Sequence, residues 1–280
     1  MIRLIAMDVD GTLLNSRKQL TETTVQALEQ AAAAGLQLVI ATGRMNTELA
    51  ALRGQLPMVR YVISCTGAEV LDLHSGETLS RDPLSAEELR MLYGRLSGLD
   101  VMHQVFSEHD GKIHNSEADV ARLAHFTTPA LEPQIRSTHV LERDLDAFVA
   151  NYRGSVNKMH MFFANAEEKA EGLRRLTGLP YVILSSEAND LEIMAPGVDK
   201  GRGLRQLAQK LGIRQEETAA IGDGDNDAAM LRWAGLGIAM GNASAAARGA
   251  ADLETADCDH EGLANAVAEI LKYNQREKSI

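Results

Sequence analysis

Two short acidic segments, far apart in the chain, carry the residue types best suited to binding a metal ion. The first is DVDGT at residues 8–12, and the second is GDGDND at residues 222–227. Each segment directly follows a short apolar run that is typical of a buried strand. In an open α/β sheet, ligand sites form at the carboxyl ends of parallel strands, so the two segments would converge at one edge. Their carboxylates suit Mg²⁺, which prefers oxygen ligands and completes its shell with water and substrate phosphate.

Calcium is the first alternative, because an EF-hand loop also begins with acidic residues at alternate positions. Counted from Asp223 as position 1, the turn glycine required at position 6 is Ala228, and the glutamate required at position 12 is Ala234. The EF-hand interpretation therefore fails. An ordinary turn is the other alternative for either segment alone, since Asp and Gly are common in turns. Two such turns, each directly after a buried strand, favour the metal site.

Strands and helices alternate at both ends of the chain, and these elements must position the acidic segments. Buried strands are predicted at residues 4–7, 38–41, 61–64, 191–194, 218–221 and 236–240. Helices are predicted at residues 21–34, 203–211, 228–233 and 261–272, with a further helical segment that ends at Leu52. Such alternation is typical of βαβ units and predicts an α/β fold with a Rossmann-like doubly wound parallel sheet.

The middle of the chain, residues 83–187, breaks this alternation. Ser85 and Glu88 form a capping box that opens a helix, and hairpin strands follow at 101–106 and 112–114. A strand at 156–163 lies between helices at 144–152 and 166–176. We therefore expect an α+β domain at residues 83–187, inserted into a core made of residues 1–82 and 188–280.

Composition limits the classes of partner. The 280 residues carry a formal net charge of −11, which argues against nucleic acid or an anionic membrane as the main partner. The two cysteines, Cys65 and Cys258, lie far apart, so no disulfide framework or zinc site is indicated. The apolar run at the N-terminus is too short for a signal peptide, and no apolar segment approaches the roughly 20 residues needed to cross a bilayer. A cytoplasmic protein is expected.

Four segments together resemble the motifs of a known family. DVDGTLL at residues 8–14, ATGR at 41–44, VDKG at 198–201 and GDGDNDAAM at 222–230 occur in the order of the haloacid dehalogenase superfamily of phosphatases. The insert is similar to the large cap of the Cof-like, type IIB branch. The resemblance covers essentially the whole chain. It implies a Mg²⁺-dependent phosphohydrolase of small phosphorylated metabolites, either sugar phosphates or phosphorylated cofactors.

The resemblance also implies the catalytic roles. Asp8 would be the nucleophile that forms an aspartyl-phosphate, and Asp10 would protonate the leaving group and then activate water. Thr42 would hydrogen-bond a phosphoryl oxygen, and Lys200 would offset the negative charge of Asp8 and the phosphate. Family members that keep a long-lived phosphoenzyme have Thr at the place of Asp10, so Asp10 favours hydrolysis. Phosphomutases of the superfamily keep this aspartate, and a sugar phosphate mutase is therefore the alternative function.

The expected metal site combines both acidic segments. By resemblance, the Mg²⁺ ligands would be the Asp8 carboxylate, the Asp10 backbone carbonyl and the Asp223 carboxylate. Asp227 is the fourth residue of the predicted metal site. It would act mainly by holding the groups around the ion in place, and not as a direct ligand. Asp225 is expected not to bind metal. A non-catalytic metal-binding protein is a third alternative, but the retention of Asp8, Asp10 and Lys200 argues against it.

The expected substrate ligands come from both domains: Thr42, Gly43, Arg44, Lys158, Lys200 and Asn226. Strand alternation over residues 156–163 places Lys158 and His160 on one face, opposite a methionine-rich face expected to lie under helices. Arg44 could bind phosphate or form an ion pair within the core. Relatives commonly have Asn-Gly-Ala where this chain has Thr66-Gly67-Ala68, so a substrate contact at Thr66 is in doubt. The expected partner is a small-molecule phosphate ester, bound by a monomer or homodimer.

Overall fold

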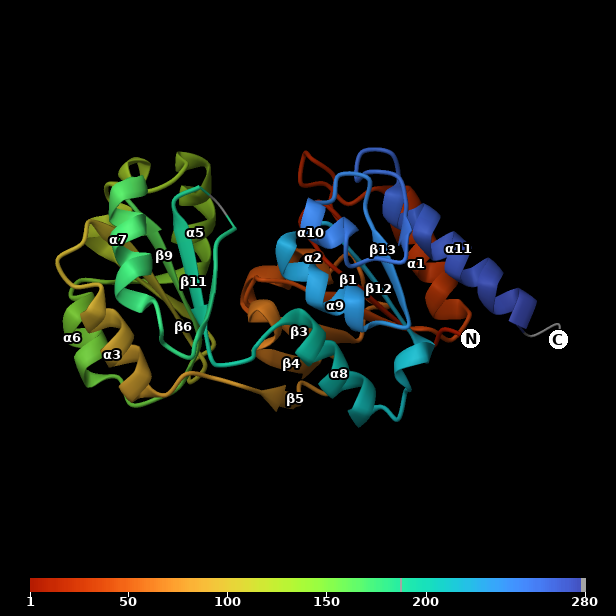
Figure 1. The fold of residues 1–280 in the computed structure, drawn as a ribbon, viewed down its shortest axis with the longest axis horizontal. Coiled ribbons are helices and arrows are strands. Elements are labelled where there is room, and N and C mark those ends of the chain that lie inside the picture. Colours follow the sequence, from red (N-terminus) through yellow and green to blue (C-terminus); the bar gives the residue numbers. More distant parts are fainter. Residues whose placement is uncertain (187, 278–280) are drawn as a thin grey trace. The chain divides into compact units, whose positions relative to one another are not determined.

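The computed structural model describes residues 1–186 and 188–277, and the chain forms two compact units (Figure 1). The first unit comprises Met1–Arg81 together with the chain from Asp199 onward, and the second unit comprises Asp82–Val198. Each unit has its own sheet.

The sheet of the first unit has eight strands in the order β14-β13-β12-β1-β2-β3-β4-β5. The six strands from β14 to β3 run parallel, and β4 and β5 are antiparallel additions at the edge. The chain runs from β1 to β2 on one side, while β12 returns on the other side of β1. The strand order therefore reverses at β1. The strands are β1 (Leu4–Met7), β2 (Gln37–Ala41), β3 (Tyr61–Ser64), β4 (Glu69–Asp72), β5 (Thr78–Arg81), β12 (Thr218–Gly222), β13 (Leu236–Ala239) and β14 (Leu253–Glu254).

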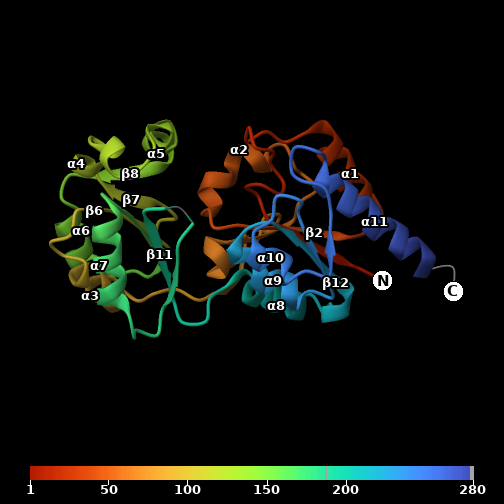
Figure 2. The ribbon, with the colours of Figure 1, turned by 45° about the horizontal axis from the view of Figure 1, so that its top comes forward.

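Helices cover both faces of this sheet, as the apolar character of its strands requires (Figures 1 and 2). Ile5 and Met7 pack with α1 and α11 on one face, while Leu4 and Ala6 pack with α8, α9 and α10 on the other. Helix α1 begins at its N-cap Thr21, whose side chain accepts the amide of Thr24. The helical elements are α1 (Glu22–Ala33), η1 (Asn46–Leu49), α2 (Ala50–Arg53), η2 (Cys65–Gly67), α8 (Lys200–Lys210), η5 (Gln215–Glu217), η6 (Asp225–Asp227), α9 (Ala228–Trp233), α10 (Ala245–Arg248) and α11 (Gly262–Glu277).

The second unit has a six-stranded sheet in the order β10-β11-β9-β6-β7-β8. Helices α3, α6 and α7 lie on one face, where the Phe163 ring packs against Gly172 of α7 and His114 stacks on Phe148 of α6. Met102 and Phe162 on the other face pack with α4, η3 and α5 (Figure 2). The elements are α3 (Ala86–Arg95), β6 (Val101–Ser107), β7 (Ile113–Ser116), α4 (Glu117–Val120), η3 (Leu123–His125), η4 (Pro129–Leu131), α5 (Glu132–Thr138), β8 (His139–Glu142), α6 (Leu145–Asn151), β9 (Val156–Phe163), α7 (Ala166–Leu176), β10 (Val182–Leu184) and β11 (Asp190–Met194).

The strand predicted at residues 191–194 exists, but its assignment to the parallel core sheet is wrong. It forms β11, which pairs antiparallel with β9 through Leu191 and Met161, and with β10. The second division between the units therefore falls after Val198 and not at residue 188. The apolar pattern is the same for a strand of either sheet, and only the pairing partner distinguishes them.

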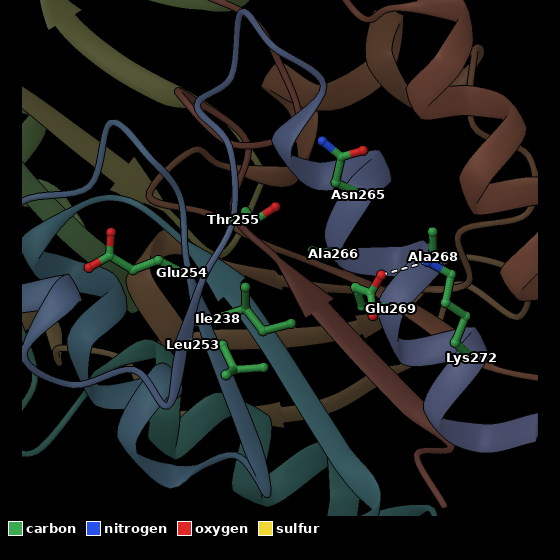
Figure 3. Close-up of a pocket in the computed structure, with 9 residues that line it drawn as sticks. All are labelled: Ile238, Leu253, Glu254, Thr255, Asn265, Ala266, Ala268, Glu269 and Lys272. Carbon is green, nitrogen blue, oxygen red and sulfur yellow. Dashed lines mark hydrogen bonds and ion pairs between the residues drawn. The ribbon is translucent and has the colours of Figure 1, made fainter. Parts of the chain in front are cut away.

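None of the helices in the described part of the chain is both long and apolar enough to span a membrane. A surface hollow of about 230 Å³ lies between β13, β14 and α11 in the first unit, where Ile238 and Leu253 face the side of α11 (Figure 3). It contains none of the predicted catalytic residues.

Candidate active site

The carboxyl ends of β12, β1 and β2 bring three predicted site residues to one edge of the first unit. The strands are neighbours and parallel, with Ala6 of β1 opposite Ala220 of β12 and Val39 of β2. Asp223 follows β12, Asp8 follows β1, and Thr42 follows β2. This is the place where the strand order reverses, which is where open α/β sheets form ligand sites.

The turn after β1 is held tightly against the turn after β12. Leu13 donates its amide to the carbonyl of Asp8 at 3.2 Å, and Gly11 has φ +87°, a conformation that favours glycine. A β-carbon at Gly11 would collide with the Asp223 carboxylate. The first segment therefore requires glycine so that the second can approach it.

Lys200 joins this edge from the first turn of α8. Asp199 caps the helix by accepting the amide of Arg202 at 2.6 Å. Gly201 leaves no room for a β-carbon against the Ala229 carbonyl of α9, so the two helices approach closely. The fully buried Lys200 ammonium lies 2.5 Å from Asp8 Oδ1 and 2.6 Å from Asp227 Oδ1.

Asp227 organises the GDGDND turn from inside. It is fully buried, and its Oδ2 accepts the backbone amides of Asp223 at 2.9 Å and Gly224 at 2.8 Å. Both of its carboxylate oxygens therefore have protein donors. By contrast, Asp225 is exposed, and Asn226 is partly exposed.

The electrostatics of this cluster favour a divalent cation. Asp8, Asp223 and Asp227 offer oxygens that all lie within 4.8 Å of one another. Burial, followed by the Asp227 carboxylate, raises the pKa of Asp8 to about 8, and burial raises the pKa of Asp223 to about 6. Burial opposes the charge of Lys200, but Asp227 and Asp8 outweigh it and raise the pKa of that ammonium. When all three carboxyl groups are ionised, they and the one ammonium leave an excess of two negative charges, and their oxygens fit Mg²⁺, which would neutralise this excess.

Asp10 points its carboxylate toward two cations. Arg44 donates through Nε to Oδ2 at 2.9 Å and through Nη2 to Oδ1 at 2.6 Å, and Lys18 Nζ lies 2.8 Å from Oδ1. Although burial opposes the change, these contacts lower the pKa of Asp10. Arg44 thus forms an ion pair within the first unit, one of the two roles expected for it, while its phosphate contact stays a prediction.

The turn after β2 is tied to a strained turn after β3. Thr42 is buried, its Oγ1 accepts the Arg44 amide at 3.2 Å, and its carbonyl accepts the Thr66 amide at 2.9 Å. Cys65, Thr66 and Gly67 have φ values of 49°, 60° and 103°, all in the left-handed region. Such strain in non-glycine residues is typical of functional turns. Gly43, between Thr42 and Arg44, completes the first of these turns, and the substrate contacts of this group stay predictions.

Lys158 lies in the second unit and has partners there. Its ammonium lies 3.0 Å from Glu192 Oε2 and 4.6 Å from the centre of the Phe106 ring, and its side chain is only 3 % exposed. His160, the next residue on the same face of β9, contacts Asp190 at 2.9 Å. Binding of substrate by Lys158 stays a prediction.

Three residues that the sequence did not single out contact this site. Thr12 donates its hydroxyl to Asp223 Oδ1 at 2.8 Å, and Asn242 Nδ2 lies 3.1 Å from Asp223 Oδ2 and 2.9 Å from the Gly11 carbonyl. Asn242 follows β13, so the rule that sites form at the carboxyl ends of strands could have found it. Lys18, the third, lies in a loop that carries no such signal.

Comparison with known proteins supports the family suggested by the motifs. The family model of haloacid dehalogenase-like hydrolases matches residues 5–267. The chain is 31% identical to phosphatase YwpJ of Bacillus subtilis (strain 168), over 96% of this chain and 100% of that protein. It is 27% identical to pyridoxal phosphate phosphatase YbhA of Escherichia coli (strain K12), over 94% of this chain and 96% of that protein.

Solved structures agree with the fold. A haloacid dehalogenase-like hydrolase from Bacteroides thetaiotaomicron superposes with a TM-score of 0.81 at 28% identity, covering 96% of this chain and 100% of that chain. The subclass IIB sugar phosphatase BT4131 superposes with a TM-score of 0.78 at 25% identity, covering 96% and 98%. The predicted Rossmann-like α/β fold with an inserted α+β domain is confirmed. The chain therefore belongs to the haloacid dehalogenase-like hydrolase family, as a phosphatase of its Cof-like, type IIB branch.

Proposed function

We propose that the protein is a Mg²⁺-dependent phosphohydrolase of small phosphorylated metabolites that works through an aspartyl-phosphate on Asp8. The observation that carries this proposal is the cluster of Asp8, Asp223 and Asp227 around the buried Lys200 ammonium. Phosphoryl transfer needs positive charge at the phosphate and an in-line nucleophile. The relatives named for pyridoxal phosphate and for sugar phosphates support the proposed substrate range, sugar phosphates or phosphorylated cofactors.

In the proposed first step, an oxygen of the Asp8 carboxylate attacks phosphorus and the bond to the ester oxygen breaks. For this step Asp10 must be protonated against the effect of Arg44 and Lys18, which lower its pKa; it gives the proton to the departing oxygen, so the alcohol leaves as a neutral molecule. Lys200, in contact with Asp8 Oδ1, holds the nucleophile in place and offsets charge on the phosphate. In the second step, Asp10 takes a proton from water, whose oxygen attacks phosphorus, and inorganic phosphate leaves as the Asp8 carboxylate is restored.

Mg²⁺, held by the Asp8 and Asp223 carboxylates and the Asp10 backbone carbonyl, would supply further positive charge at the phosphate. Asp227 serves this site by fixing the turn, because its Oδ2 accepts the amides of Asp223 and Gly224. Thr42 and Asn226 are proposed phosphate contacts, with Gly43 and Arg44 beside them. The side chain of Asn226 is partly exposed and forms no hydrogen bond with the described residues 1–186 and 188–277, so it is available for this contact.

The test is release of inorganic phosphate from an aryl phosphate by the purified protein. We expect activity with Mg²⁺, loss of activity with EDTA, and loss in Asp8→Asn. Asp225→Asn is the matched control, because it removes a carboxylate from the exposed side of the same site and should retain activity. Phosphate release that survives Asp8→Asn would remove Asp8 from the nucleophilic role. A mutase instead of a hydrolase would convert a hexose 1-phosphate into its 6-phosphate without releasing phosphate.

A further inference from the structure

The loop that follows the first acidic segment is built around Asn15 and holds Lys18 in an unusual backbone conformation. The Oδ1 atom of Asn15 accepts the amides of Arg17 at 3.0 Å and Gln19 at 2.9 Å, and its carbonyl accepts the amide of Lys18 at 2.9 Å. Within this turn Lys18 has φ +59°. Lysine is not among the residues that favour the left-handed region, so the turn fixes Lys18 there at some conformational cost.

From this conformation the Lys18 side chain reaches Asp10, the predicted acid and base. Its Nζ lies 2.8 Å from Asp10 Oδ1, although the Lys18 side chain is 63% exposed. A lysine this exposed is ordinarily solvated, and an ion pair at the surface contributes little stability. A strained backbone that serves a weakly stabilising pair points to a role in function.

The two oxygens of Asp10 are not equivalent. Oδ1 accepts from both Lys18 Nζ and Arg44 Nη2, which uses both of its lone-pair positions. Oδ2 accepts only from Arg44 Nε among the described residues, so one of its positions stays open. Lys18 therefore leaves Oδ2 as the Asp10 oxygen with a position open to a further partner.

We propose that Lys18 is a positioning residue that, by occupying Asp10 Oδ1, makes Oδ2 the oxygen through which Asp10 transfers protons. The proposal rests on the proposed function of Asp10. In the first step, the proton on Oδ2 moves to the ester oxygen as its bond to phosphorus breaks, which leaves a carboxylate and a neutral alcohol. In the second step, Oδ2 takes one proton from the attacking water. Both transfers use the same atom, so the side chain need not turn between the two steps.

The test compares two substrates that differ in their need for a proton. An aryl phosphate with a weakly basic leaving group departs without protonation, whereas an alkyl phosphate requires it. The quantity to measure is kcat/KM, because it covers the steps up to departure of the leaving group and excludes hydrolysis of the phosphoenzyme. General acid catalysis contributes roughly 10²–10⁴-fold, so loss of one positioning contact should lower kcat/KM for the alkyl phosphate roughly tenfold.

For Lys18→Met we expect this roughly tenfold loss on the alkyl phosphate and less than about threefold on the aryl phosphate. Lys18→Arg should retain most of the wild-type kcat/KM for the alkyl phosphate. Arg17→Met, which removes a cation from the same turn, should leave kcat/KM unchanged for both substrates. Lys18→Gly relieves the backbone strain but removes the ammonium, so it should behave like Lys18→Met. In an Asp10→Asn background, Lys18→Met should have no further effect on the alkyl phosphate.

Several outcomes would overturn the inference while leaving the proposed function intact. The first is an active wild-type protein in which Lys18→Met lowers kcat/KM equally for both substrates. The second is a Lys18→Met variant whose kcat/KM is unchanged for both substrates, and the third is a Lys18→Gly variant with wild-type selectivity between them. If the wild-type protein releases phosphate from neither substrate, the proposed function itself fails.

Discussion

Replacing Asp8 by Asn should stabilise the metal-free protein while it removes activity. Two effects oppose each other at this position. The Asp8 side chain is 9% exposed and lies 2.5 Å from the Lys200 ammonium, which favours the carboxylate. Burial and the nearby carboxylate of Asp227 disfavour it, and their sum raises the pKa of Asp8 from 3.8 to about 8. The repulsion and desolvation therefore outweigh the ion pair.

The sign of the pH dependence follows from this raised pKa. The unfolded protein loses the Asp8 proton near pH 3.8, whereas the folded protein keeps it up to about pH 8. The contribution of Asp8 to stability is therefore complete below the unfolded pKa and is lost as pH rises toward 8. Each pH unit within this window lowers the contribution of Asp8 to the free energy of unfolding by about 1.4 kcal/mol. The free energy of unfolding of Asp8→Asn, relative to the wild type, should therefore rise by about 2 kcal/mol between pH 6 and pH 8.

Scanning calorimetry in EDTA at these two pH values would measure the effect, because it can separate the transitions of the two units. About 2 kcal/mol corresponds to a difference of roughly 4–8 °C in the unfolding temperature of a unit this size. Saturating Mg²⁺ should reduce or reverse the difference, since the ion neutralises the carboxylates. Asp225→Asn, at an exposed position of the same turn, is the control, and its unfolding temperature relative to the wild type should not change between the two pH values. The reasoning is refuted if Asp8→Asn is the less stable protein at both pH values.

Two further predictions test the metal site and the strained turn. Asp223→Ala should weaken Mg²⁺ binding, measured by titration calorimetry, by roughly 100-fold or more, because it removes a ligand and the loss of a group that only orients a ligand already costs roughly 10–100-fold. Asp225→Ser should leave binding unchanged, and equal losses in the two variants would contradict the assignment. Gly67→Ala should lower the free energy of unfolding by about 2 kcal/mol or more, because Gly67 has φ +103° and its β-carbon would collide with the Asp199 carbonyl. Gly76→Ala, where φ is +74° and nothing lies near the β-carbon, should cost about 1 kcal/mol, and a similar loss in both variants would exclude the collision.

Local patterns predicted the elements that carry the site with good accuracy. The strands at residues 4–7 and 61–64 and the helix at 228–233 have the predicted bounds, because each is a short apolar or helix-forming run with turn residues at its ends. The acidic segments after β1 and β12 could be placed at one edge because parallel strands of a βαβ sheet end on the same side. The strand at 191–194 shows the limit of this reasoning, since its apolar pattern fits either sheet.

By itself, the sequence determined which residue types follow which strands, and hence that Asp8 and Asp223 meet, while the family resemblance placed Thr42 with them. Only the tertiary structure decided how these residues are held. Asp227 directs both of its oxygens to protein donors, and Asp10 is shared between Arg44 and Lys18. The reason is physical: the strand pattern fixes where a backbone ends, whereas a side chain's partners depend on loops whose conformations have no sequence period. Lys18 shows this most clearly, because it contacts Asp10 from a left-handed backbone conformation that no sequence period signals.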